Sequence, residues 1–195
     1  MRSVEIHRLT NETEVNIHLN LDGTGQHQIN TGVGFLDHML CHVAVHGLFD
    51  LNLQVNGDLE VDTHHTVEDS ALALGQALDQ ALGDRSGIVR MGSAYVPMDE
   101  ALALVVVDLS GRPYTVFQAQ WQGPILGQMP TSLIRHFFVS LASTARANIH
   151  AQLFHSQDDH HGAEAFFKAL GRALDTATQI APRREEVPST KGTLT

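Results

Sequence analysis

The chain has 195 residues, 43% of them hydrophobic, and a formal net charge of −10 at pH 7. This length fits one compact domain, or two small halves around a shared core, and the acidic balance argues against a nucleic-acid partner, which needs a clustered basic face. A single cysteine, Cys41, excludes an internal disulfide and a multi-thiolate metal site. Because no segment is apolar enough for a membrane span or a signal peptide, we expect a cytoplasmic protein without a membrane partner.

The first half of the chain predicts strands and then alternating helices and strands. Apolar side chains alternate over residues 12–21, with Val15 and Ile17 on one side, which predicts a half-buried strand. The turn residues at 22–23 predict a hairpin that leads into a second strand near 25–31. We then expect a helix at about 34–46, a strand at 50–56 and a helix at 64–82.

The second half repeats this pattern. The segments LGQALDQA from Leu74 and LGRALDTA from Leu170 match at six of eight positions, at an offset of 96 residues. These matches predict an internal duplication, with repeats at about 1–90 and 91–182 and a tail at 183–195. In the second repeat we expect strands near 100–108 and 113–120, a helix at 131–146, a strand at 148–154 and a helix at 160–178.

The pattern as a whole predicts an α+β fold over residues 1–195. Sheets of this kind need helices to cover their apolar faces, so we expect a single domain built as a two-layer sandwich from two duplicated halves. Two antiparallel-rich sheets would each be covered by helices. The polar tail carries Pro188, and we expect it to be mobile or to be ordered by a ligand.

Histidine is the anomaly of the composition, with 13 copies, and it is the commonest side-chain ligand of transition metals. The motif HHxxE opens the last helix of each repeat and places its glutamate four residues after the first histidine and three after the second. Adjacent histidines diverge by about 100° around a helix axis, so they suit two ions better than one. One such pair is usually a surface accident, but two pairs in register favour metal binding.

Two copies of the motif, with one histidine from each preceding helix, give two sites of three histidines and one glutamate. The predicted ligands are His38, His64, His65, Glu68, His136, His160, His161 and Glu164. The repeat suggests one site of His64, Glu68, His136 and His161 and another of His160, Glu164, His38 and His65, in one subunit or between neighbours. Nitrogen and carboxylate donors suit octahedral Mn²⁺, although Zn²⁺, Fe²⁺ or Co²⁺ would also bind.

Three histidines recur every fourth residue in the helix at 34–46, a pattern that is also typical of a polar helix face. We predict that His38 is a ligand and that His42 lies on the surface. For His46 a substrate contact and a surface position both stay open. Cys41 lies among them, and nothing identifiable nearby lowers its pKa, so we expect no reactive role for it.

Along nearly its whole length the chain resembles the imidazoleglycerol-phosphate dehydratase family. The matching stretches include RLTNETEV, GVGFLDHML, DTHHTVEDSALALGQAL, VDLSGRPY, HHGAEAFFKALGRAL and PSTKGTL, in the family's order and spacing. One departure is Cys41–His42, where the family usually has an acidic or amide pair. The resemblance implies a tandem ribosomal protein S5 domain 2-like fold and a lyase of histidine biosynthesis. It also implies two Mn²⁺ ions per active site, held between subunits of a homo-oligomer of twenty-four copies with octahedral symmetry.

The resemblance further implies roles for individual residues. Its metal ligands are the eight side chains already named. Its substrate contacts are Glu12, His38, His46, His64, His65, Glu68, Arg90, Arg112, Ser189, Thr190 and Lys191, of which the last five supply cations and hydroxyl or backbone donors for a phosphate. Its catalytic residues are Glu12, His64, His65, Glu68, His160, His161 and Glu164. Asp99 and Glu100 either shape the pocket or form an exposed pair at a strand end.

The substrate that the resemblance implies is imidazoleglycerol phosphate, and its chemistry constrains the mechanism. The proton that is lost from the glycerol arm does not lie beside a carbonyl group, so a base alone cannot remove it. The electrons that expel the hydroxyl must therefore come from the imidazole ring. Two metals on the ring nitrogens would favour the imidazolate, which can expel the adjacent hydroxyl and leave a diazafulvene. Proton loss then gives an enol that becomes the ketone, imidazole-acetol phosphate. Glu12 is the candidate for this acid–base work, and its alternative is a strand-surface charge.

Two other classes of function stay open at this point. A metal-dependent phosphoesterase would also use two ions and arginines, but such sites usually recruit more aspartates and bridging carboxylates. Release of inorganic phosphate would identify it. A non-catalytic metal-storage protein would leave Arg90, Arg112 and the STKG segment of the tail without a purpose.

Overall fold

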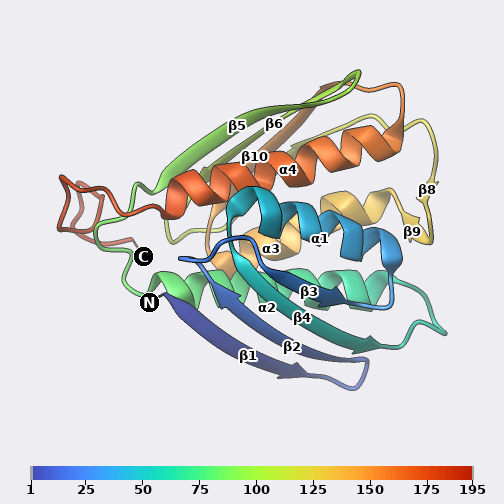
Figure 1. Cartoon of the computed structure of the whole chain (residues 1–195), viewed down its shortest axis with the longest axis horizontal. Coiled ribbons are helices and arrows are strands. Elements are labelled where there is room, and N and C mark those ends of the chain that lie inside the picture. Colours follow the sequence, from blue (N-terminus) through green and yellow to red (C-terminus); the bar gives the residue numbers. More distant parts are fainter. Residues whose placement is uncertain (1, 195) are drawn as a thin grey trace.

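Figure 1 shows a computed structural model of the chain, which describes residues 2–194. The first half contains β1 (Ser3–Leu9), β2 (Thr13–Asn20), β3 (His27–Asn30), α1 (Gly34–Gly47), β4 (Asp50–Gly57) and α2 (His64–Leu82). The second half contains β5 (Met91–Met98), β6 (Ala101–Asp108), β7 (Tyr114–Gln118), the short β8 (Ile125–Leu126) and β9 (Met129–Pro130), α3 (Ser132–Ala145), β10 (Asn148–His155) and α4 (Asp159–Thr178). Apart from the β8–β9 insertion, the two halves have the same order of elements.

Each half forms one four-stranded sheet, and the two sheets have equivalent topology. The strand order is β1-β2-β4-β3 in the first sheet and β5-β6-β10-β7 in the second. Neighbouring strands are antiparallel in β1-β2-β4 and in β5-β6-β10. The fourth strand of each sheet is parallel to its neighbour, since β3 pairs with β4 and β7 pairs with β10 in parallel. The fold is therefore α+β with two mixed, antiparallel-rich sheets, which confirms the fold class expected of the duplicated sequence.

The predicted hairpin after residues 12–21 is wrong, because β3 pairs with β4 and not with β2. The crossing segment is held at the start of β4, where Asp50 Oδ1 accepts the backbone N–H groups of Thr24 (2.8 Å) and Gln26 (3.0 Å). The strands β1 and β5 were not predicted from the sequence. In β1 only Ile6 is buried, and the inward position after it is Arg8, so the apolar alternation is too short to mark this edge strand.

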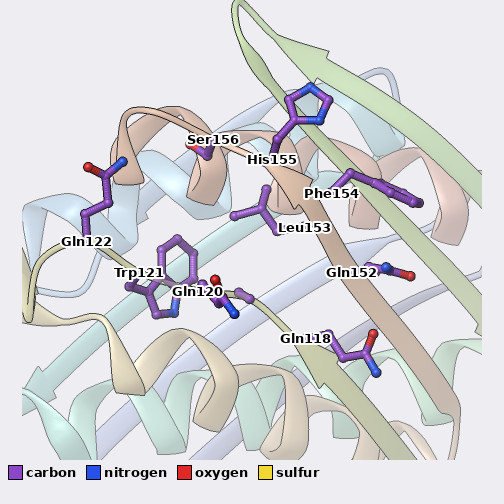
Figure 2. Close-up of a pocket in the computed structure, with 10 residues that line it drawn as sticks. Gln118, Gln120, Trp121, Gln122, Gln152, Leu153, Phe154, His155 and Ser156 are labelled. Atoms are coloured by element: carbon purple, nitrogen blue, oxygen red, sulfur yellow. The ribbon is translucent and has the colours of Figure 1, made fainter.

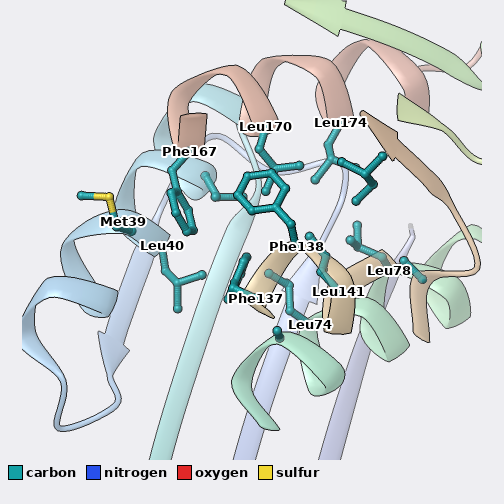
Figure 3. Packing of buried hydrophobic residues seen from close by; sticks show 14 of the residues in the cluster. Met39, Leu40, Leu74, Leu78, Phe137, Phe138, Leu141, Phe167, Leu170 and Leu174 are labelled. Atoms are coloured by element: carbon teal, nitrogen blue, oxygen red, sulfur yellow. The ribbon is translucent and has the colours of Figure 1, made fainter. Parts of the chain in front are cut away.

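The helices lie between the two sheets, so each half is a two-layer unit and the halves stack through their helices (Figure 1). In this stack α1 packs against α4, and α2 packs against α3. All four helices begin at the same end of the molecule. Figure 3 shows the apolar side chains that meet between them, among them Met39, Leu40, Leu74, Leu78, Phe137, Phe138, Leu141, Phe167, Leu170 and Leu174. Within residues 2–194, no helix is both long and apolar enough to cross a membrane.

Two glycines that correspond in the duplication allow the helix pairs to approach closely. A Cβ at Gly75 would lie 2.5 Å from the carbonyl oxygen of Leu141 in α3, and one at Gly171 would lie 2.8 Å from that of Val43 in α1. Real Cβ atoms do not come so near to backbone. The repeated LG at this position is therefore a packing requirement of both helix pairs.

We expect Gly75→Ala to lower the free energy of unfolding by about 1–3 kcal/mol, the usual effect of overpacking a core, although alanine is the better helix former. Denaturant titration at fixed protein and metal concentrations measures the change. Gly34→Ala is the control, because Gly34 also lies in a helix, at the first residue of α1, and a Cβ there meets nothing within 4 Å. Equal stability of Gly75→Ala and the unmodified protein would contradict this account.

Candidate metal centre

Each HHxxE motif is fixed at the start of its helix by an aspartate two residues before the first histidine. Asp62 Oδ1 accepts the backbone N–H of His64 (2.7 Å), and Asp158 Oδ1 accepts that of His160 (2.8 Å). Such local side-chain bonds satisfy N–H groups that have no partner within the helix. The two aspartates are themselves 96 residues apart, so the duplication preserves the helix start together with the motif.

The first cluster joins α2 of the first half to α3 of the second. His64 Nε2 lies 3.6 Å from Glu68 Oε2, and His136 Nε2 lies 3.5 Å from Glu68 Oε1. The two imidazole rings are 4.7 Å apart. One ligand atom from each of these three residues lies within 4.8 Å of the others. The spacing predicted this grouping from the repeat alone.

The second cluster joins α1 of the first half to α4 of the second. His38 Nε2 lies 2.8 Å from Glu164 Oε1, and His160 Nε2 lies 3.0 Å from the same oxygen. These three residues again offer ligand atoms within 4.8 Å of one another. The structure thus brings together three of the four residues predicted for each site.

The carboxylate of Glu164 is buried and has more partners than that of Glu68. Lys168 Nζ donates to Glu164 Oε2 at 2.6 Å, and His42 Nε2 lies 3.3 Å from that oxygen. Burial by itself would raise the pKa of Glu164, but hydrogen bonds from Lys168, His38 and His160 outweigh it and lower the pKa to about 2. Lys168 was not predicted as part of the site, although its position four residues after Glu164 on α4 indicates a contact between the two side chains.

The prediction that His42 lies on the surface is wrong. Its side chain is only 17% exposed and packs beside Glu164, with its ring 4.6 Å from that of His38. Burial lowers the pKa of His42 to about 4, so the ring is neutral at neutral pH. His46 is half-buried next to it, and burial lowers its pKa as well. Burial also raises the pKa of the Cys41 thiol, in agreement with the expected lack of reactivity.

The two clusters fit a divalent cation. His136 Nε2 is buried without a hydrogen-bond partner, and a lone pair in that position is satisfied by a metal ion. The donors are imidazole nitrogen and carboxylate oxygen without thiolate, a set that suits Mn²⁺, Zn²⁺, Fe²⁺ or Co²⁺. His38, His64, Glu68, His136, His160 and Glu164 could therefore hold two ions.

The second histidine of each motif turns away from the cluster on its own helix. His65 Nδ1 lies 2.9 Å from Asp58 Oδ2, and His161 Nδ1 lies 2.8 Å from Glu100 Oε2. The hydrogen bond to Asp58 raises the pKa of His65, and that to Glu100 raises the pKa of His161. Glu12 Oε1 lies 3.6 Å from the other ring nitrogen of His65, which places this half-exposed carboxylate beside a predicted ligand.

A second group of predicted residues meets at the other end of the molecule. Arg90, Arg112, Ser189, Thr190 and Lys191 line one pocket of about 560 Å³, together with Arg184, which the sequence analysis did not single out. The Arg90 guanidinium donates to both carboxylate oxygens of Asp108 (2.6 and 2.9 Å) and to the carbonyl of Pro188 (2.7 Å), so it holds the tail in place. In Figure 1 the tail lies opposite the end at which the helices begin.

A larger hollow, of about 720 Å³, lies elsewhere and contains none of the predicted site residues. It lies between the segment after β7 and the end of β10, and Figure 2 shows Trp121, Phe154 and His155 among its lining side chains. Cavity size alone therefore does not locate the site in this chain.

Known proteins of one family match this chain both in sequence and in structure. A family model described as imidazoleglycerol-phosphate dehydratase matches residues 31–174. A protein of that name from Chloroflexus aggregans is 57% identical over 99% of this chain and 95% of its own length, and one from Ruminiclostridium cellulolyticum is 52% identical over all of both chains. The crystal structure of the Staphylococcus aureus enzyme has a TM-score of 0.83 at 38% identity, covering 92% of this chain and 99% of that one. The Pyrococcus furiosus protein in complex with (S)-C348 has a TM-score of 0.84 at 35% identity, covering 97% and 100%.

Proposed function

The chain belongs to the imidazoleglycerol-phosphate dehydratase family, and from this premise we propose how its own residues carry out the reaction. The activity is that of a hydro-lyase of histidine biosynthesis, which removes water from imidazoleglycerol phosphate. We take imidazole-acetol phosphate to be the product. The repeats at about 1–90 and 91–182 and the tail at 183–195 are proposed to form one functional unit, in the cytoplasm and without a nucleic-acid or membrane partner.

We propose that the two clusters each hold one Mn²⁺ ion. The observation that carries this proposal is the pair of equivalent clusters, each with two imidazole nitrogens and a carboxylate within 4.8 Å. His65 and His161 are proposed to complete the ligand sets of a neighbouring copy, since they turn away from the clusters of their own chain. When bound, such cations supply Lewis acidity toward the imidazole ring of the substrate.

The distance between the two groups of residues supports an assembled site. Helix α2 has 19 residues and is about 28 Å long, and the tail that lines the phosphate pocket lies opposite the end at which the helix begins (Figure 1), so most of the helix length separates the two groups. A substrate made of one imidazole ring, a three-carbon arm and a phosphate cannot span that length. We therefore propose that the phosphate pocket of one copy meets the metal clusters of another, in a homo-oligomer of twenty-four subunits with octahedral symmetry.

The remaining residues then have separate tasks. Arg112 and Lys191 are proposed to supply the positive charge that binds the phosphate, with Arg90, which is already paired with Asp108, and Ser189 and Thr190 as additional donors. The Glu12 carboxylate is proposed to move the proton of the substrate's arm, because it lies beside His65 Nε2 and belongs to neither cluster. His46 lies beside His42 on α1 and is proposed to contact the substrate.

Dialysis against a chelator, followed by assays with and without added Mn²⁺, tests the proposal. We expect ketone formation from imidazoleglycerol phosphate only after the cation is restored, because the ring must be polarised before the hydroxyl can leave. Inorganic phosphate is measured in the same samples. Its release would point to a phosphoesterase, and metal binding without either product would point to storage.

A further inference from the structure

The two outward-turned histidines share a feature that the other predicted ligands lack. Each has its Nδ1 within hydrogen-bond distance of a carboxylate that belongs to neither cluster: Asp58 for His65 and Glu100 for His161. A carboxylate only accepts, so the imidazole nitrogen that faces it carries the proton. In the neutral ring the Nε2 atom then keeps its lone pair, which is the form that binds a metal ion.

We propose that Asp58 and Glu100 are positioning residues, which fix His65 and His161 as Nδ1–H tautomers and aim Nε2 at the metal. This inference rests on the proposed function, in which the two histidines are ligands. Carboxylates that hold the second nitrogen of a metal-bound histidine are common, and they set both the orientation and the basicity of the ring. Neither Asp58 nor Glu100 touches the substrate in this account, and both act through the histidine.

Glu100 is itself held rigidly. Its Oε1 atom accepts the backbone N–H groups of Gln157 (3.0 Å) and Asp158 (2.9 Å), which leaves Oε2 for His161. Gln157 and Asp158 directly precede α4, on which His161 lies. The turn between β5 and β6 is thereby tied to the start of α4, so the direction of the His161 ring is set by backbone and does not depend on a freely rotating side chain.

Comparison of the two halves shows that the supporting residues differ. Glu12 and Glu100 correspond in the duplication, because each directly precedes the second strand of the first hairpin of its half. Glu100 faces Nδ1 of its histidine, whereas Glu12 lies 3.6 Å from Nε2 of His65. In the first half Asp58 takes over the support of Nδ1. Glu12 is thus released from the positioning task and is free for acid–base work.

The affinity of the full chain for Mn²⁺, measured by equilibrium dialysis, tests this proposal. We expect Glu100→Ala to lower the Mn²⁺ affinity of the site that His161 completes by about 10–100-fold, the usual effect of removing such a partner. Glu100→Gln should recover part of the loss, because its amide oxygen can still accept from Nδ1. Asp58→Ala should weaken the other class of site in the same way. Glu60→Gln is the matched control, since Glu60 is an exposed carboxylate near the start of α2.

A double-variant cycle separates positioning from a general effect on folding. If Glu100 acts through His161, then adding Glu100→Ala to His161→Ala should not weaken binding further. Additive losses, or an unchanged affinity in Glu100→Ala, would overturn the proposal. Unchanged binding in His161→Ala would instead overturn the ligand set on which the proposed function rests. Thermal denaturation of the metal-free variants records any loss of the backbone contacts at Gln157 and Asp158.

Discussion

Replacement of Glu12 by glutamine is expected to lower turnover by about 10²–10⁴-fold, the range in which a positioned acid or base contributes. Glutamine keeps the shape of the side chain but cannot take up a proton. Because Glu12 belongs to neither three-residue cluster, the content of bound Mn²⁺ should stay the same. The measurements are kcat for ketone formation and the metal content of the purified protein.

Glu14→Gln is the control for this variant. Glu14 lies two residues further along the same segment and faces His7 at 3.1 Å, away from the clusters, so its replacement should leave turnover unchanged. Full activity of Glu12→Gln would remove Glu12 from the acid–base role. Loss of bound Mn²⁺ together with activity would instead show that Glu12 is a metal ligand, since its carboxylate lies 3.6 Å from His65 Nε2.

Replacement of Glu164 by glutamine is expected to reduce the bound cations from two per chain to one and to bring turnover to background. The Glu164 carboxylate is the group that His38 and His160 share. Loss of its charge should weaken that cluster by more than about 100-fold, beyond the effect of removing a partner outside the ligand set. It also leaves the half-buried Lys168 without its carboxylate. Elemental analysis after gel filtration gives the metal count.

Glu68→Gln should remove the other cation, since Glu68 has the corresponding place between His64 and His136. This pair of variants tests whether the clusters are independent. Glu60→Gln, which changes an exposed carboxylate close to α2, should keep both ions. Two cations per chain in Glu68→Gln and in Glu164→Gln would contradict the assignment of both clusters.

The helices and the grouping of ligands could be predicted from the sequence because the signal was repeated. The HHxxE motif and the offset of 96 residues predicted the start of α2 at His64 and the pairing of both motifs with a histidine from the other half. The strand partners could not be predicted in the same way. A local turn at 22–23 indicates a hairpin, but β3 pairs in parallel with β4, a strand that follows α1 in the chain, and no local pattern shows that pairing.

The parts of the site that the sequence did not show are the contacts that turns make with the starts of the helices. Asp58 and Glu100 reach their histidines from turns, and no periodicity connects a turn to the helix that it supports. His42 was misplaced for a related reason. It lies on the same helix stripe as His38, and only the packing of α1 against α4 buries it beside Glu164. A pattern within one helix cannot reveal which neighbour covers it.

The stacking of the halves through their helices has a consequence for how the site is built. Exchange of the halves turns the α1–α4 contact into the α3–α2 contact, so the arrangement has an approximate twofold axis. Each cluster takes its motif from one half and its remaining histidine from the other. A single half therefore supplies only part of each cluster, and neither cluster exists unless the two halves meet. The two clusters are nevertheless not identical, because Lys168 pairs with Glu164 whereas the corresponding position after Glu68 is Leu72.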